Sequence, residues 1–364
     1  MPVTYSVQIK DSAANIWEFE KVADLAWETR ENDVGKCRIQ IPYNDTKLTS
    51  SSIQSGRGEI RIYRNGTLRW QGLIAVPIDN KDGTTIYGFD FMESLKWYRC
   101  PEEAYDGAGF DYTTKKIGTE IISPIWNIIA ARTNPILGTL IQKGTIEDPY
   151  TVGTSTAKTI SKTTVGEDFF SLLKEMVALS RADSPSGSWK QDTAFAISLS
   201  ESAPTFSFTR DVGSDKADVR FELDSEITNF TYVDDTRYLR NNIIGYTITE
   251  NPSVLTSNQV NTTSRDSYYL REISPVFGLA DKQTALDEHT KDFLKENESG
   301  TTSTYLQFAS GLVPFDGYSM GDALRVIINR GRVSIDDYYK VYGMVVNYRA
   351  GTEFTVPLLR RKRT

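Results

Sequence analysis

The sequence predicts a β-rich α+β fold in which two β-rich ends flank an inserted α+β module. Apolar and polar residues alternate over residues 1–100, as expected of short strands, and alternate again over much of residues 216–364. Over residues 101–215, two segments instead carry apolar residues at helical spacing. A chain of 364 residues is long enough for two or three cores. We therefore expect three domains with these boundaries.

The first stretch contains seven short alternating segments, from TYSVQI at its start to TTIYGFDF near its end. Turn-forming residues separate them at Asn32-Asp33-Val34-Gly35, at Asn65-Gly66 and at Asp82-Gly83. Seven short strands with such turns predict a closed or nearly closed β-structure.

Four aromatic side chains of this stretch fall on positions that could share one interior. A buried aromatic ring removes about 150–250 Å² from water, so we interpret them first as core residues. Stacking of exposed tryptophans on sugars is the functional alternative. The four residues are Trp17, Trp27, Trp70 and Phe89.

The middle stretch predicts two helices. The first covers KKIGTEIISPIWNIIAAR, where Pro124 should bend or split it. The second follows Glu167 and Asp168, acids that suit a helix N-terminus, and buries apolar residues at helical spacing. We expect GTSTAKTISKTTVG and DSPSGSW to be loops, and TAFAISLS and TFSFTRD to be strands. The predicted buried residues of the second helix are Phe169, Leu172, Leu173, Met176 and Val177.

The last stretch predicts a strand pair joined at Asn241-Asn242 and a helix around residues 280–298. The segment Gly321–Val346 then predicts a hairpin that turns at residues 329–332, with a second bend near Asp336 and Asp337. A final strand, EFTVPLL, follows. The predicted buried stripe of the helix is Leu286, Thr290, Phe293 and Leu294.

The composition excludes several classes of protein. With a net charge of −7 and a pI near 5.1, the whole chain is no basic nucleic-acid clamp. The longest apolar patch, Ile121–Ala131, is interrupted and falls short of the roughly 20 residues of a membrane span. The first residues alternate like a strand and lack the apolar region of a signal peptide. We expect synthesis in the cytoplasm and no membrane span.

Residues for catalysis or metal binding are scarce. Cys37 and Cys100 are too few for a disulfide framework or a four-ligand zinc site, and we interpret both as core residues. His289 is the one histidine, and its place beside a buried helical stripe favours packing over catalysis. Asp336 and Asp337 could form a carboxylate pair, but neighbouring residues of a strand point to opposite faces. We predict no enzyme, and no catalytic, cofactor-binding or metal-binding residues.

A family resemblance follows from the order of several motifs. LAWETRENDVGKCRIQIPYND, IRIYRNG and WQGLIAV, in that order, are similar to the opening domain of phage tail hub proteins. The later helix, the lead-in from Pro314 to Gly321-Asp322, and VSIDDYYKVYGM resemble a later hub domain. The resemblance is to the siphophage minor tail or baseplate hub family, which is related to the central hub of contractile-phage baseplates.

This resemblance implies an architecture and a set of partners. Family hubs are trimers with two similar β-barrel domains per chain, so that three chains present six barrels to the hexameric tail tube. It therefore implies hub domains at residues 1–100 and 216–364, and a virion protein at the tail tip that takes part in host attachment. Its expected partners are the distal tail ring protein, the tape-measure protein and a tail fibre or tip protein. Genomic DNA should pass through the lumen at ejection without specific binding.

Two alternative functions and one segment stay open. The chain could be a receptor- or glycan-binding tail protein that uses the middle module or its tryptophans. A cell-wall hydrolase with paired acids is a weaker alternative. The basic segment Arg360–Arg363 could touch DNA or the tape-measure protein, but we favour a disordered, solvated end.

Overall fold

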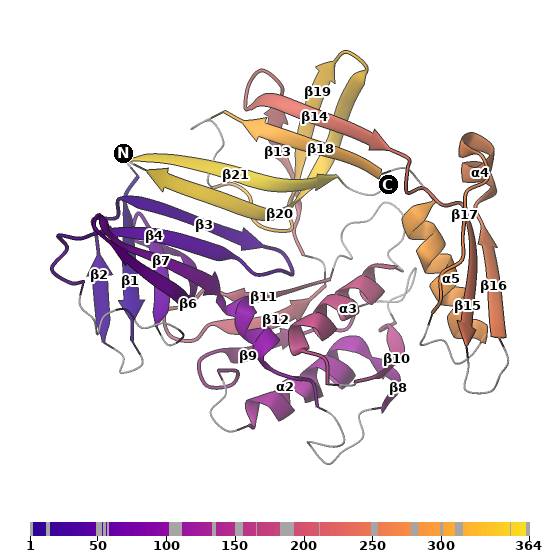
Figure 1. Cartoon of the computed structure of the whole chain (residues 1–364), viewed down its shortest axis with the longest axis horizontal. Helices are drawn as coiled ribbons and strands as arrows, with labels where there is room; N and C mark the ends of the chain where they lie inside the picture. The colour runs from indigo at the N-terminus through magenta and orange to yellow at the C-terminus, as the bar shows by residue number, and fades with distance from the viewer. Residues whose placement is uncertain are drawn as a thin grey trace. The chain divides into compact units, whose positions relative to one another are not determined.

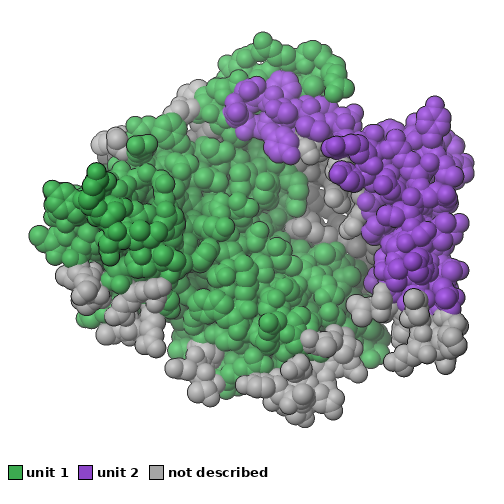
Figure 2. All heavy atoms as spheres, viewed as in Figure 1, with its two compact units in different colours: residues 1–228, 308–364 green, residues 229–307 purple. Residues whose placement is uncertain are grey.

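A computed structural model gives the fold of most of the chain. Contacts divide it into two compact units, residues 1–228 with 308–364 and residues 229–307, which Figure 2 shows in green and purple. The structure describes residues 3–11, 15–48, 53, 56, 58–101, 111–132, 136–149, 156–164, 166–182, 193–210, 212–248, 254–277, 283–298, 301–309, 316–349 and 351–361.

All seven strands predicted for the first stretch are present (Figure 1). The turn between the third and fourth strands holds Asn32 at a φ of 54°, and the turn between the fifth and sixth holds Asn65 at 50°. Asparagine tolerates this left-handed region better than most residues, which explains the turn signals in the sequence. The strands are β1 (Tyr5–Lys10), β2 (Ile16–Phe19), β3 (Asp24–Arg30), β4 (Lys36–Pro42), β5 (Glu59–Arg64), β6 (Thr67–Asn80) and β7 (Gly83–Asp90).

These strands join strands from the end of the chain in one eleven-stranded sheet. Its order is β13-β19-β20-β3-β4-β7-β6-β5-β1-β2, and β21 pairs with β20. Strand β20 pairs with β19 through its first half, and with β3 and β21 through its second half. The late strands are β13 (Asp215–Glu222), β19 (Ala323–Arg330), β20 (Val333–Arg349) and β21 (Thr352–Arg361).

The predicted hairpin is present, but the predicted second bend is wrong. Strand β20 continues without a break from Val333 to Arg349. Its partner β19 extends the pairing as far as Lys340, which lies opposite Ala323, so the backbone around Asp336 and Asp337 stays extended. The ladder of hydrogen bonds to β19 therefore determines this segment.

The sheet curls back on itself. Strands β1 and β20 are separated by five strands in the sheet order, yet the rings of Tyr5 and Tyr348 have centroids only 4.8 Å apart. The Tyr5 hydroxyl donates to the Glu353 carboxylate at 2.6 Å, and Arg64 Nε donates to the same carboxylate at 2.7 Å. The core inside the curl consists of Tyr5, Val7, Ile9, Phe19, Leu25, Trp27, Cys37, Ile39, Ile41, Ile60, Ile62, Trp70, Ile74, Ile86 and Val346.

The expectation of one interior for four aromatic residues is correct for three of them. Trp27 and Trp70 are buried in this core and Trp17 packs against it. Phe89 packs against a second core instead. Residues an odd number apart on a strand point to opposite faces, and Phe89 lies three residues after the inward-facing Ile86.

The middle stretch forms the predicted α+β elements. Strands β11, β12 and β9 form a three-stranded sheet, and β10 pairs with β8. The segment GTSTAKTISKTTVG therefore contains a strand, β10, where we predicted only a loop; DSPSGSW lies outside the described residues. The elements are the 3₁₀ helix η1 (Phe91–Trp97), β8 (Asp111–Lys116), the π-helix η2 (Ile117–Ile122), α2 (Ser123–Ala130), β9 (Gln142–Ile146), β10 (Thr159–Thr163), α3 (Phe169–Ala182), β11 (Ala194–Ser198) and β12 (Thr205–Thr209).

Both helix predictions for this stretch are confirmed. The first helix divides into η2 and α2 with Pro124 in the first turn of α2, where its missing N–H leaves no bond unmade. Asp168 accepts a hydrogen bond from Ser171 N at 2.8 Å and so caps α3. The predicted apolar residues of α3 are buried in the second core, where Trp126 stacks on Phe206 with centroids 4.7 Å apart.

The second unit contains the helix predicted around residues 280–298. This helix packs on β15 and β16 of a three-stranded sheet in the order β16-β15-β17, and buries Leu286, Thr290 and Leu294. Strand β14 pairs with β18 in a separate ribbon. The elements are β14 (Ile227–Asp235), β15 (Asn242–Ile248), β16 (Val254–Val260), α4 (Thr262–Tyr268), β17 (Glu272–Ile273), α5 (Gln283–Asn297) and β18 (Thr301–Phe308).

The strand pair predicted across Asn241-Asn242 is wrong. Strand β15 pairs with β16 and β17, whereas β14 pairs with β18. Asn241 is fully buried, and its backbone N–H donates to the carbonyl of Arg271 rather than closing a turn. Two adjacent asparagines are typical of a turn, but here they hold the loop around Arg271 in place.

Candidate functional site

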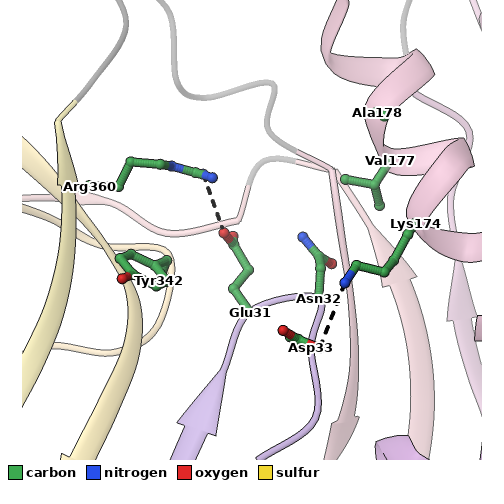
Figure 3. Close-up of a pocket in the computed structure, with 8 residues that line it drawn as sticks. All are labelled: Glu31, Asn32, Asp33, Lys174, Val177, Ala178, Tyr342 and Arg360. Carbon is green, nitrogen blue, oxygen red and sulfur yellow. Dashed lines mark ion pairs between the residues drawn. The ribbon is translucent and has the colours of Figure 1, made fainter. Parts of the chain in front are cut away.

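A pocket of about 230 Å³ lies where three parts of the first unit meet (Figure 3). The turn after β3 forms its floor, helix α3 one wall, and strands β20 and β21 another. Its lining residues are Glu31, Asn32, Asp33, Lys174, Val177, Ala178, Tyr342 and Arg360.

Glu31 is the centre of a buried ion pair beside this pocket. Its side chain is 4% exposed, and Lys340 Nζ, on a side chain that is 6% exposed, lies 2.6 Å from its carboxylate. Arg360 lies 3.6 Å from the other carboxylate oxygen. The Glu31 N–H also donates to the Tyr342 carbonyl at 2.7 Å. These contacts connect the turn after β3 to strands β20 and β21.

The basic end of the chain is not wholly a solvated tail. Arg360 and Arg361 belong to β21, and the Arg360 guanidinium pairs with Glu31. The prediction of a disordered end is therefore wrong for these two residues, because strand pairing with β20 orders them. Lys362 and Arg363 lie outside the described residues.

The Asn32 side chain connects the pocket floor to strand β11. The residue is 8% exposed, and its Oδ1 accepts from Phe195 N at 2.7 Å. Its Nδ2 is buried and has no partner among the described residues. Lys174 and Asp33, whose nearest charged atoms are 3.7 Å apart, close the other side. The lining carries two carboxylates, Glu31 and Asp33, and both are engaged in ion pairs.

None of the candidate catalytic residues lines this pocket. The His289 ring stacks on Phe277 with centroids 5.8 Å apart, which confirms its predicted packing role. Asp336 accepts two hydrogen bonds from Arg325, at 2.7 and 2.8 Å, and this guanidinium lowers the pKa of the Asp336 carboxyl. Asp337 accepts instead from the Tyr338 N–H. The two acids thus have separate structural partners.

Both cysteines are buried, as predicted, and burial raises the pKa of each thiol. A thiol of this kind is protonated at neutral pH and is a poor nucleophile or metal ligand. Among the described residues, no three His, Cys, Asp or Glu side chains gather as a metal site. No described helix has the length and hydrophobicity to span a membrane.

A buried carboxyl that the sequence analysis missed lies between the two cores. Asp90 accepts hydrogen bonds from Gly35 N at 2.7 Å and from Met92 N at 3.1 Å, and it caps η1. Burial raises the pKa of Asp90 to about 7, although both N–H groups favour the charged form. Its geometry is that of a helix cap, which the motif Asp90-Phe91-Met92-Glu93 suggests only weakly.

The second unit carries an exposed aromatic tip, Tyr268–Leu270. Tyr269 is 87% exposed and has a φ of 64°, which is unusual for a residue other than glycine. The buried Asn241 side chain holds this backbone: its Nδ2 donates to the Tyr269 carbonyl at 2.7 Å and its Oδ1 accepts from Arg271 N at 2.8 Å. Nothing in the sequence distinguishes these tyrosines from the others.

Comparisons with known proteins show which proteins have a similar fold. No protein-family model matches the sequence, and no curated protein matches it. Among solved structures, the chain is similar to the 43 kDa tail protein of prophage MuSo2 from Shewanella oneidensis, with a TM-score of 0.64, 11% identity and 98% of both chains covered.

Two further solved structures agree with this. A tail protein from Neisseria meningitidis MC58 has a TM-score of 0.60 and 14% identity, covering 98% of this chain and 97% of that one. The prophage tail protein gp18 from Listeria monocytogenes EGD-e has a TM-score of 0.57 and 12% identity, covering 99% and 95%. The chain therefore has the fold of phage tail proteins, and the predicted resemblance to that group is confirmed at the level of the fold.

Proposed function

We propose that this chain is a structural hub protein of a phage tail tip and acts without catalysis. The observation that supports this best is the fold it shares with three tail proteins, two of them from prophages, over at least 95% of the length of each chain. The acids and the histidine that an enzyme would use are engaged in packing or in ion pairs. A structural role needs only binding surfaces and a rigid scaffold, and the eleven-stranded sheet supplies the scaffold.

In this proposal three copies form a ring that adapts the hexameric tail tube to the tip or fibre proteins. Domains 1–100 and 216–364 act as two related barrels around an inserted module at residues 101–215. The sheet that curls from β1 to β20 supports the first barrel, and β13 and β19, which pair beyond β20, supply strands for the second. Rings arise when heterologous contacts close under rotation, so each barrel would meet a different neighbour on each side.

The proposed partners are the distal tail ring protein, the tape-measure protein, and the fibre or tip protein of a siphophage-like tail. Genomic DNA would pass through the ring during ejection. The net charge of −7 supports passage without specific binding, since each neutralised phosphate would add affinity that slows sliding.

Light scattering on the purified full chain tests this proposal. The hub proposal expects a mass that is a multiple of three chains, unchanged by added glycans. A chain that stays monomeric at every concentration would overturn the ring.

One observation favours a second candidate, a receptor- or glycan-binding role. Tyr268 and Tyr269 are exposed on a fixed tip, and aromatic faces of this kind can stack on sugars or anchor a protein partner. Trp27 and Trp70 cannot serve, because they are buried. Retention on immobilised host glycans that is lost in Tyr269→Ser would favour this role; equal retention of both proteins would exclude the tip.

A further inference from the structure

Strand β16 of the second unit is an edge strand with little of the usual protection. It pairs with β15 on one side, and no described strand pairs with its other side, where the Gln283 side chain donates a hydrogen bond to the Thr256 carbonyl at 2.9 Å (Figure 1). Its sequence, Val-Leu-Thr-Ser-Asn-Gln-Val, has no charged residue and no proline. Natural edge strands are commonly protected by charges, prolines or bulges, because unpaired N–H and C=O groups invite another strand. An uncharged edge of seven residues suggests that a strand covers it.

The exposed face of β16 is well defined. Helix α5 covers the other face of this sheet: a Cβ on Gly245 of β15 would lie 2.2 Å from Thr290 Oγ1 of α5, and Ser257, opposite Gly245, is buried. Side chains alternate along a strand, so residues 254, 256, 258 and 260 lie on the open face. All four are exposed. The two at the ends are apolar, with Val254 58% and Val260 38% exposed.

The exposure pattern of β16 is symmetric about its central residue, Ser257. Residues one step away are exposed, residues two steps away are half-buried, and the valines three steps away are exposed. An antiparallel pairing of two copies centred on Ser257 places Val254 of one copy opposite Val260 of the other, at both ends. Thr256 then faces Asn258, and no like charges meet. The strand is therefore complementary to itself in this register.

We propose that two copies of this chain pair through their β16 strands, antiparallel and in register at Ser257. The product is a continuous six-stranded sheet with both α5 helices on one face. This contact has twofold symmetry and is independent of the threefold ring proposed above. Each would change the mass differently, since β16 pairing doubles the mass of whatever assembly the rest of the chain forms.

A pair of double variants of the full chain tests the register. Val254→Lys with Val260→Lys places lysine opposite lysine at both ends of the pairing. Val254→Lys with Val260→Glu places lysine opposite glutamate at the same two ends. All three substituted positions are exposed in the single chain, and Val276→Lys, on the open face of the same sheet but away from the β16 edge, is the matched control.

Light scattering after size exclusion, at matched concentration and low salt, gives the readout. We expect the wild type, the Val276→Lys control and the lysine–glutamate variant to have twice the mass of the double-lysine variant. Circular dichroism checks that all four proteins are folded. Equal masses for the wild type and the double-lysine variant would overturn the proposal. A lysine–glutamate variant with the same halved mass as the double-lysine variant would also overturn it, because the pairing register would then be wrong. A mass that is not a multiple of three would contradict the ring and leave the twofold ratio intact.

Discussion

Removing Lys340 should destabilise the first unit strongly, because it breaks a buried ion pair. The change Lys340→Met keeps most of the side chain's length and removes its charge. Glu31 would then be left in the interior, with its side chain 4% exposed and Arg360 3.6 Å from its carboxylate. Breaking a buried pair by deleting one member costs about 3–5 kcal/mol. Since half-exposed Arg360 still offers some compensation, we expect about 3 kcal/mol.

Equilibrium urea unfolding of the full chain, followed by tryptophan fluorescence, measures this loss. Lys115→Met is the matched control, since Lys115 lies 3.7 Å from Glu120 with both side chains well exposed. Exposed pairs contribute at most about 1 kcal/mol, so the control should barely change the free energy of unfolding. Replacing both Glu31 and Lys340 by Met should cost less than Lys340→Met alone, because no charge is left buried. A cost below about 1 kcal/mol for Lys340→Met, or strictly additive costs in the double variant, would refute this reasoning.

Three further predictions concern single buried residues. Because the pKa of Asp90 is about 7 when folded and 3.8 ordinarily, the folded state holds the proton between these pH values, so this residue's contribution to stability falls as pH rises from about 4 to 7. In urea unfolding, the free energy of unfolding should fall between pH 5 and pH 7 by about 2 kcal/mol more in the wild type than in Asp90→Asn. An equal fall in both proteins would contradict this. Asn241→Ala removes both hydrogen bonds to the aromatic tip, so amide exchange over residues 268–272 should speed up at least tenfold, and unchanged protection would show that other contacts hold the tip. Gly245→Ala should cost about 1–3 kcal/mol by overpacking, and Thr290→Ala in the same chain should recover part of it, since the Phe277 ring would still lie 2.8 Å from the new Cβ; no recovery would show that Thr290 is not a source of the strain.

Elements governed by local rules could be predicted from the sequence. The seven early strands follow from period-two alternation and turn residues, and Trp27 and Trp70 are buried as expected. The division of a helix near Pro124 and the cap at Asp168 follow from the chemistry of helix termini. These features depend on residues within a few positions of one another.

Features that depend on distant partners could not be predicted. The ladder between β20 and β19 keeps the segment around Asp336 extended. The pairing of β20 with β3 joins residues about 300 positions apart, and together with the pairing of β20 with β21 it sets Arg360 beside Glu31 and so creates the pocket. Strand β10 is ordered by its ladder to β8, although its own sequence resembles a loop. Phe89 faces the second core because it lies three residues after the inward-facing Ile86 on the same strand.

Imaging the purified full chain by electron microscopy tests the central proposal, that this protein is a ring-forming hub of a phage tail, most directly. The account predicts particles with threefold symmetry around an open channel, whether single rings or pairs joined through β16. Particles that average to an isolated chain, or to an assembly without a threefold axis, would contradict it.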